Sequence, residues 1–216
     1  MTPCSLLYHA TPLHYLPHIL GSGALYAKSI LAGQGIKPRR SAVRRDTMLG
    51  LTDWVHLSMR SDTPLLQDKL ARGYPHVLFE FGREAVLALP EVALLPYNTK
   101  AWHTRSAYVP VTDAAEKIEM LRRHDETNQF PSLEVLVHYG LDFTYLQKIV
   151  FPADNERVWV SDLLTVLSFN LPAPLIVDPA LAALYVPGEI RLLTRDYLAA
   201  CGAAGCVLPP PEIVFD

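Results

Sequence analysis

The sequence lacks the features that mark membrane and secreted proteins. No apolar run reaches the about 18 to 20 residues that a membrane-spanning helix needs. The segment from Met1 to Cys4 has neither the basic start nor the cleavage site of a signal peptide. The three cysteines, Cys4, Cys201 and Cys206, are an odd number without metal-like spacing, so they suggest neither a disulfide framework nor a zinc site. We therefore expect a cytoplasmic protein without a metal cofactor.

The common nucleotide-binding and hydrolase motifs are also missing. The sequence contains no Walker loop, no G-x-G-x-x-G turn after a strand, no H-E-x-x-H helix and no G-x-S-x-G turn. Its eight histidines are scattered, and the one pair with ligand spacing, His14 and His18, has no third ligand nearby. The function must therefore be inferred from less common patterns.

Composition and charge indicate the number of domains and the kind of ligand. Half of the 216 residues are apolar, so we expect residues 1–216 to form a single domain with a sizeable core. The net charge of −3 is uneven, because residues 28–60 alone carry an excess of five positive charges. Such a basic segment is a candidate footprint for the phosphates of a nucleotide or a polynucleotide. The alternative is a solvated loop whose arginines pair with acidic neighbours.

Hydrophobic periodicity and turn residues predict short, mixed elements. Strands are predicted over residues 6–10, 54–58, 76–81, 92–95, 132–139, 148–151, 175–177, 183–185 and 213–215. Helices are predicted over residues 12–20, 64–72, 112–124, 160–167 and 194–200, with a long loop over 28–50 and an irregular stretch over 97–110. In the helix over 112–124, Thr112 is the expected N-cap, and Ala115, Ile118 and Leu121 are expected to face inward. The predicted fold class is α+β, built on two short sheets.

Glu134 stands at the head of the strongly apolar strand over 132–139. Because side chains alternate in a strand, Glu134, Leu136 and His138 share one side, and Val135 and Val137 share the other. A carboxylate at the edge of a core is costly unless it is paired or serves a chemical purpose. The strand alone leaves both interpretations open.

Four segments between residue 6 and about residue 151 carry a resemblance to one family. They are Leu7 to Thr11 with the apolar helix after it, Ile36 to Arg40, Leu51 to Leu65, and Leu133 to Val137. In this order they resemble the DarT-type ADP-ribosyltransferases, toxin enzymes that transfer ADP-ribose from NAD to a base of single-stranded DNA. Residues 152–216 match no part of the family that we can place.

The resemblance implies a fold, a co-substrate and partners. The fold would be an ADP-ribosyltransferase-like core of two short, mostly antiparallel sheets with flanking helices. NAD would be the co-substrate, no metal would be needed, and single-stranded DNA would be the acceptor. The protein would act as a toxin or defence effector, and a macrodomain-type ADP-ribosyl-hydrolase antitoxin is a candidate partner.

The resemblance also assigns roles to individual residues. Glu134 corresponds to the catalytic glutamate and Arg40 to the active-site arginine, although Arg39 is an alternative for the second role. The remaining assignments are to NAD binding (His9, Thr11, Arg39, Trp54 and His56) and to nucleic-acid binding (Arg44, Arg45, Arg60 and Trp102). For His9, a satisfied core histidine is the alternative.

Physical chemistry supports these assignments independently. Cleavage of the bond between nicotinamide and ribose develops positive charge on the ribose, which a fixed carboxylate stabilises. An arginine offers two parallel donors to a pyrophosphate. Because its pKa lies above about 12, we expect Arg40 to act as an electrostatic clamp and not as a base.

The sequence departs from the family pattern after Asp53 and Trp54. The family has more aromatics there and then Pro-Arg-Ser-Pro, whereas this chain has His56, Ser58 and the run Met59 to Asp62. The accepting base therefore stays open between thymine, guanine and a base in RNA.

Two other functional classes remain as alternatives. One is a non-catalytic module that binds nucleic acid or a partner, against which stands Glu134, because a carboxylate weakens a phosphate groove. The other is a relative that hydrolyses NAD or modifies protein. Ser132, two residues before Glu134, disfavours protein arginine as the acceptor, because arginine-directed relatives have Glu or Gln there.

Overall fold

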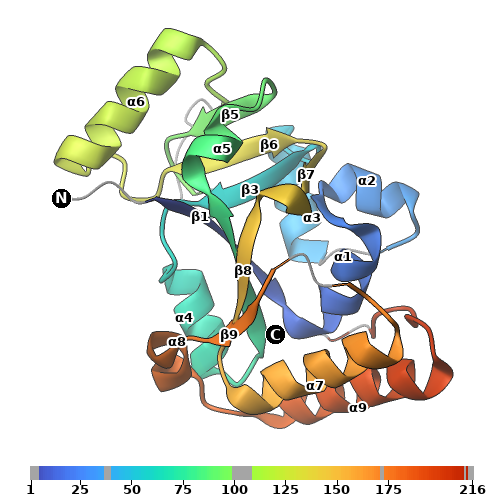
Figure 1. Ribbon diagram of the computed structural model, residues 1–216. Helices are drawn as coiled ribbons and strands as arrows, with labels where there is room; N and C mark the ends of the chain where they lie inside the picture. The colour runs from blue at the N-terminus through green and yellow to red at the C-terminus, as the bar shows by residue number, and fades with distance from the viewer. Residues whose placement is uncertain (1–4, 37–39, 99–108, 171–172, 212, 214–216) are drawn as a thin grey trace. The chain divides into compact units, whose positions relative to one another are not determined.

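The computed structural model describes residues 5–36, 40–98, 109–170, 173–211 and 213, without the side chains of residues 40–43. The chain divides into two compact units (Figure 1). Unit 1 comprises Met1–His9, Leu25–Ser61 and Phe81–Tyr145, and unit 2 comprises Ala10–Ala24, Asp62–Glu80 and Leu146–Asp216. The single domain expected over residues 1–216 stays a prediction.

The described elements form a mixed α+β fold. The strands are β1 (Leu6–Pro12), β2 (Ala24–Tyr26), β3 (Trp54–Ser58), β4 (His76–Gly82), β5 (Val92–Leu95), β6 (Glu134–His138), β7 (Gly140–Asp142), β8 (Leu146–Phe151) and β9 (Leu175–Val177). The helices are α1 (Leu16–Ser22), α2 (Lys28–Gly33), α3 (Arg40–Leu49), α4 (Pro64–Ala71), α5 (Arg83–Leu87), α6 (Ala114–Thr127), α7 (Asp154–Val166), α8 (Pro179–Leu184) and α9 (Glu189–Ala204). Short 3₁₀ turns cover Leu13–Tyr15 and Phe143–Tyr145.

Among the described residues the strands form a main sheet of seven strands and a small sheet of β2 and β7. Unit 1 contains the strand order β5-β6-β3-β1, and unit 2 contains the order β1-β4-β8-β9, with β1 and β4 contributing to both. The predicted α+β class with two sheets is confirmed. In the small sheet, Gly140 leaves little room for a side chain, because a Cβ atom would lie 3.0 Å from the Tyr26 ring.

The register in unit 1 gives its sheet two distinct faces. β6 pairs antiparallel with β3 on one side and with β5 on the other. One face carries the row Leu95, Glu134 and Ser58, which are direct partners across the three strands. The other face is apolar, with Val135 and Val137 paired to residues of both neighbours. This register agrees with the alternation predicted for the Glu134 strand.

The loop predicted over residues 28–50 is wrong, because most of this segment is helical as α2 and α3. Helix α3 has few apolar residues, and the glycines and the proline around it favour a loop, although arginine itself forms helices well. Its described part is anchored instead by the buried Asp46 and by Leu49, which packs on an apolar cluster of Leu51, Ala93, Leu95 and Leu136.

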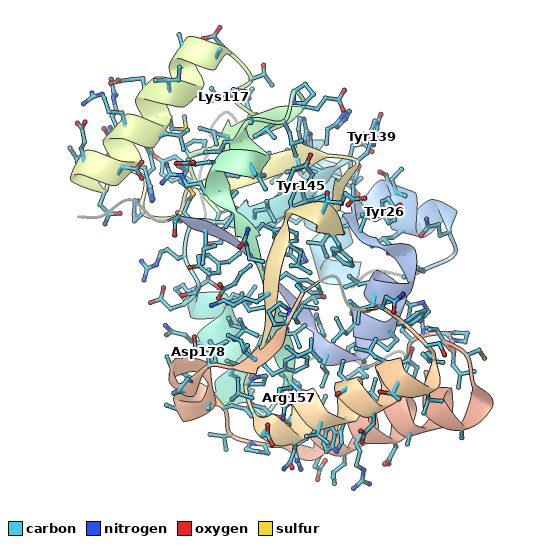
Figure 2. All side chains as sticks on the ribbon, viewed as in Figure 1. Tyr26, Lys117, Tyr139, Tyr145, Arg157 and Asp178 are labelled. Atoms are coloured by element: carbon cyan, nitrogen blue, oxygen red, sulfur yellow. The ribbon has the colours of Figure 1, made fainter. Side chains whose placement is uncertain are left out.

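Other predictions of local structure also need correction. Residues 183–185, predicted as a strand, lie at the end of α8, which Asp178 caps by accepting a hydrogen bond from the Ala180 amide at 2.7 Å (Figure 2). Helix α6 is capped by Asp113 and not by Thr112, and Ile118 on it is 68% exposed where an inward position was predicted. Ala115 on the same helix is also exposed.

Ile213 lies in no strand, and the rest of the strand predicted over 213–215 lies outside the described residues. Most of the irregular stretch predicted over 97–110 also lies outside the described residues.

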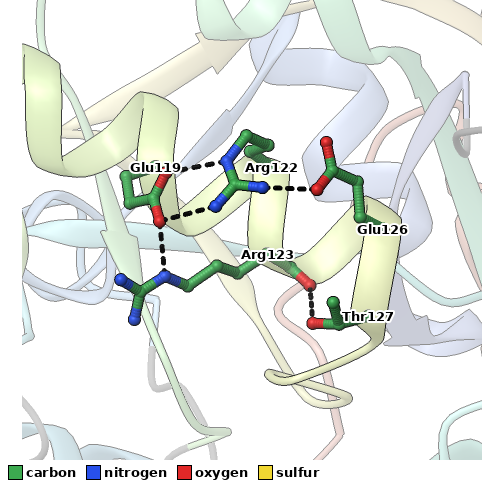
Figure 3. Close-up of polar contacts among 5 residues, drawn as sticks. All are labelled: Glu119, Arg122, Arg123, Glu126 and Thr127. Atoms are coloured by element: carbon green, nitrogen blue, oxygen red, sulfur yellow. Dashed lines mark hydrogen bonds and ion pairs between the residues drawn. The ribbon is translucent and has the colours of Figure 1, made fainter.

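Helix α6 is a charged, solvent-facing helix, as predicted. Glu119 accepts hydrogen bonds from Arg122 and Arg123 (Figure 3), and these bonds lower the pKa of Glu119 to about 2. The helix is tied to unit 1 by polar contacts. Lys117 Nζ donates a hydrogen bond to the Val92 carbonyl at 2.8 Å (Figure 2). The Asp125 carboxylate accepts hydrogen bonds of 2.9 and 2.7 Å from the two terminal nitrogens of the buried Arg83.

Residues 152–216, which the sequence left unplaced, contribute the packed helices α7 and α9 of unit 2. The fully buried Glu156 of α7 accepts hydrogen bonds from the Tyr185 hydroxyl at 3.0 Å and Arg191 Nε at 2.7 Å. The Arg191 guanidinium also lies over the Trp159 ring. These contacts connect α7 with Tyr185 and with α9. In the described part of the chain, no helix combines the length and the apolar character needed to cross a bilayer.

Candidate active site

Glu134 is buried in unit 1, and both of its carboxylate oxygens have hydrogen-bond partners. Only 6% of the residue is exposed. Its Oε2 lies 3.0 Å from His56 Nδ1, and its Oε1 accepts a hydrogen bond of 2.6 Å from Asn98 Nδ2. Charge-assisted hydrogen bonds of this kind offset the cost of burying a carboxylate. The carboxylate is therefore held in one orientation by two neighbours.

The sheet register explains why these partners meet. Ser58 of β3 lies directly opposite Glu134, so His56, two residues earlier, lies on the same face at the diagonal position. Diagonal neighbours are within reach of long side chains. On the other side Glu134 pairs with Leu95 at the end of β5, and Asn98 follows three residues later.

Behind His56 lies a second carboxylate. Asp46 of α3 is 4% exposed, and its Oδ2 lies 3.9 Å from His56 Nε2. The same carboxylate forms an ion pair with Lys28, the first residue of α2. The polar residues Lys28, Asp46, His56 and Glu134 thus form a continuous row of contacts through unit 1.

His9 on β1 joins this row through the main chain. Its Nδ1 donates a hydrogen bond of 2.9 Å to the His56 carbonyl. Burial lowers the pKa of His9 to about 4, helped by the charges of Lys28 and His56, while the hydrogen bond to the His56 carbonyl opposes the shift. His9 is therefore neutral near pH 7 with its proton on Nδ1.

The lowered pKa of His9 predicts a loss of stability on acidification. The unfolded chain binds the proton near pH 6.5 and the folded chain only near pH 4, so the stabilisation is complete above pH 6.5 and is lost as the pH falls to about 4. We expect His9→Asn, which keeps a donor for the carbonyl, to lose about 3 kcal/mol less over this range than the original chain. Urea unfolding at pH 7 and pH 4 measures the difference, and equal losses in the two proteins would contradict it.

Trp54 lies on the same sheet face as Glu134, at the far end of β3. It pairs with His138, and the centroids of the two rings are 4.7 Å apart. Trp54 also packs against the apolar cluster that contains Leu136. Beyond His138, the half-exposed Tyr139 has a positive φ of 59° and donates its amide to the Asp53 carbonyl at 2.7 Å (Figure 2). This end of the face is aromatic, whereas the Glu134 end is polar.

The structure brings together only some of the predicted site residues. Glu134, His56, His9 and Trp54 all lie in unit 1. Thr11 is buried on β1 in unit 2. Of the basic residues, Arg40 begins α3, Arg44 is exposed and Arg45 is partly exposed on the same helix, and Arg60 is exposed after β3. The side chain of Arg40, and both Arg39 and Trp102, lie outside the described residues. The roles assigned to all these residues stay predictions.

Sequence reasoning missed two polar residues of the candidate site, Asn98 and Asp46. Asn98 lies in a stretch without periodicity, and only the pairing of β5 with β6 places it beside Glu134. Asp46 is an acid within the basic segment over residues 28–60, and its position directly after Arg44 and Arg45 is a signal that could have identified it. Among the described residues, no group of three or more histidine, cysteine or acidic side chains has a metal-binding arrangement.

Comparisons with known proteins identify the fold. No protein-family model and no curated protein matches the sequence. Among solved structures, Thermus sp. 2.9 DarT in complex with NAD⁺ is 15% identical with a TM-score of 0.59, and the match covers 84% of this chain and 98% of that one. The chain has the DarT fold.

Two further DarT structures agree with this conclusion. Thermus sp. 2.9 DarT in complex with ADP-ribosylated single-stranded DNA is 14% identical with a TM-score of 0.60, covering 82% of this chain and 96% of that one. Thermosipho africanus DarTG in complex with ADP-ribose is 16% identical with a TM-score of 0.56, covering 82% of this chain and 50% of that one. The resemblance to DarT found in the four sequence segments is thus confirmed at the level of the fold.

Proposed function

We propose that the protein transfers ADP-ribose from NAD to a base of single-stranded DNA. The observation that carries the proposal is the buried Glu134, whose carboxylate is held by His56 and Asn98 in a chain with the DarT fold. Structures with this fold have been solved with NAD⁺ and with ADP-ribosylated single-stranded DNA. The NAD donor and the DNA acceptor are carried over from those proteins as part of the proposal.

Glu134 supplies the charge that the reaction needs. The bond between the ribose C1′ and nicotinamide breaks, a bond forms between C1′ and a ring or amino nitrogen of the base, and the base releases a proton. Between the two events the ribose carries positive charge, which an ionised carboxylate stabilises. Because two hydrogen bonds already fix the Glu134 carboxylate, little reorganisation is needed when that charge appears.

The remaining residues bind the two substrates. His9 lies against a ribose of NAD, Arg40 clamps the pyrophosphate, and Arg39 and Trp54 complete the NAD site. The acceptor strand is bound by the basic residues Arg44, Arg45 and Arg60 together with Trp102. A protein with this activity would act as a toxin or defence effector, for which a macrodomain-type ADP-ribosyl-hydrolase antitoxin is the candidate partner.

The acceptor is expected to be unpaired DNA, because a single strand presents its bases without the cost of flipping them out of a duplex. Transfer should be weak on a perfect duplex and should fall steeply as salt rises, since phosphate contacts by cations release counterions. Labelled NAD, matched single-stranded and duplex oligonucleotides and a salt series measure both effects. Equal labelling of strand and duplex would contradict this expectation.

The same assay identifies the base. Four oligonucleotides, each offering one kind of target base, separate guanine from thymine, and RNA versions separate the two nucleic acids. We expect one base to carry nearly all of the label. Labelling of protein but of none of the oligonucleotides would contradict the proposed function.

A further inference from the structure

His56 is the point at which the parts of the candidate site meet. Its side chain contacts Glu134 at 3.0 Å through Nδ1, and its carbonyl receives the hydrogen bond from His9. The other ring nitrogen, Nε2, is buried 3.9 Å from Asp46 and has no hydrogen-bond partner among the described residues. One residue of β3 therefore links the proposed catalytic carboxylate, the proposed ribose-binding histidine and the partly buried ion pair of Asp46 and Lys28.

We propose that His56 is a positioning residue for Glu134, and that Asp46 with Lys28 holds His56 in place. This inference rests on the proposed catalytic role of Glu134, and it changes the role expected for His56, because the imidazole points to the carboxylate and acts through it on NAD. The contact is a hydrogen bond only if the proton is on Nδ1, since an ionised carboxylate has no proton to donate. His56 then donates to Oε2 while Asn98 donates to Oε1, and the carboxylate cannot rotate without losing both bonds.

Asp46 and Lys28 act one step further away. Asp46 lies on the Nε2 side of the ring, so the imidazole is bracketed by two buried carboxylates. Two carboxylates around one imidazole would repel each other, and the ammonium group of Lys28 offsets one of the two charges. Lys28 and Asp46 come from α2 and α3, in the segment that the sequence suggested as a loop. These helices therefore support Glu134 from behind His56.

Replacing His56 by residues that place an amide nitrogen at the position of one ring nitrogen tests which nitrogen contacts Glu134. An asparagine amide matches the position of Nδ1, and a glutamine amide matches that of Nε2. We expect His56→Ala and His56→Gln to lower kcat for NAD cleavage about 10- to 100-fold, because a misplaced catalytic group has effects of this size, while the KM for NAD changes little. His56→Asn should recover most of kcat. Equal kcat in His56→Gln and His56→Asn, or an unchanged kcat in His56→Ala, would overturn the proposal.

A matched control and a double variant complete the kinetic test. His124 on α6 also has its Nδ1 bonded at 2.9 Å, but to the Phe130 carbonyl and not to a carboxylate, so His124→Asn should keep the original kcat. Asp46→Asn should lower kcat by itself and should add little to the loss in His56→Ala, because both act through the same contact. Full additivity of the two losses would contradict the linkage.

Nitrogen NMR on histidine-labelled protein gives an answer without any turnover. We expect the His56 signals to show a proton on Nδ1, and the Nδ1 resonance to shift in Glu134→Gln. A His56 ring with its only proton on Nε2 would overturn the proposal. This result separates the two claims: a protein that positions Glu134 in this way but transfers nothing to nucleic acid would contradict the proposed function and leave the role of His56 intact.

Discussion

Glu134→Gln is expected to lower the rate of ADP-ribose transfer about 100-fold or more while NAD still binds. Glutamine has nearly the same shape, and its amide oxygen can accept the hydrogen bond that His56 makes. What is lost is the negative charge, which matters mainly in the transition state, when the ribose becomes positive. The loss should therefore appear in kcat and only weakly in the affinity for NAD.

Single-turnover kinetics and calorimetric titration with NAD measure the two quantities separately. Glu91→Gln is the matched control, because Glu91 is an exposed carboxylate in the same unit whose contact is a long one, 3.4 Å, to His138. It should keep the original rate. Transfer at the original rate by Glu134→Gln would remove Glu134 from the mechanism.

Arg40→Lys is expected to be impaired nearly as much as Arg40→Ala, with losses on the order of 10-fold or more. Lysine keeps the charge but loses the planar pair of donors that matches a pyrophosphate. Arg40 is also the first residue of α3, where the N-terminal end of the helix adds partial positive charge next to any bound anion.

The measurement is the KM for NAD together with transfer to a fixed oligonucleotide. Arg39→Lys and Arg39→Ala are the matched comparison, because Arg39 is the adjacent arginine in the sequence. If only the Arg39 variants are impaired, the assignment is displaced by one residue. If lysine at position 40 restores full activity, the arginine acts as a simple charge and not as a two-donor clamp.

The parts of the site that the sequence predicted are those fixed by local alternation. Glu134 heads a strand of strongly apolar residues, so its face and its burial follow from the two-residue period alone. The same is true of His56 on β3. Its bond to Glu134 could not be predicted, because it depends on the register between strands far apart in the sequence.

The parts that the sequence did not predict depend on tertiary contacts. Helix α3 has few apolar residues and lies among glycines and a proline, so its sequence resembles a loop. In the structure its buried Asp46 forms an ion pair with Lys28. The contact between Asn98 and Glu134 depends on the pairing of β5 with β6, which the sequence does not specify. Residues 183–185 at the end of α8 form a short apolar run, and the period of such a run does not distinguish a strand from a helix.

The most direct test of the central claim is the intact mass of a single-stranded oligonucleotide after incubation with the protein and NAD. The account predicts that the oligonucleotide gains one ADP-ribose unit while one nicotinamide is released per adduct, and that Glu134→Gln produces neither. Release of free ADP-ribose with an unmodified oligonucleotide would show an NAD hydrolase, and an unmodified oligonucleotide with intact NAD would show a non-catalytic protein. Either result would contradict the account.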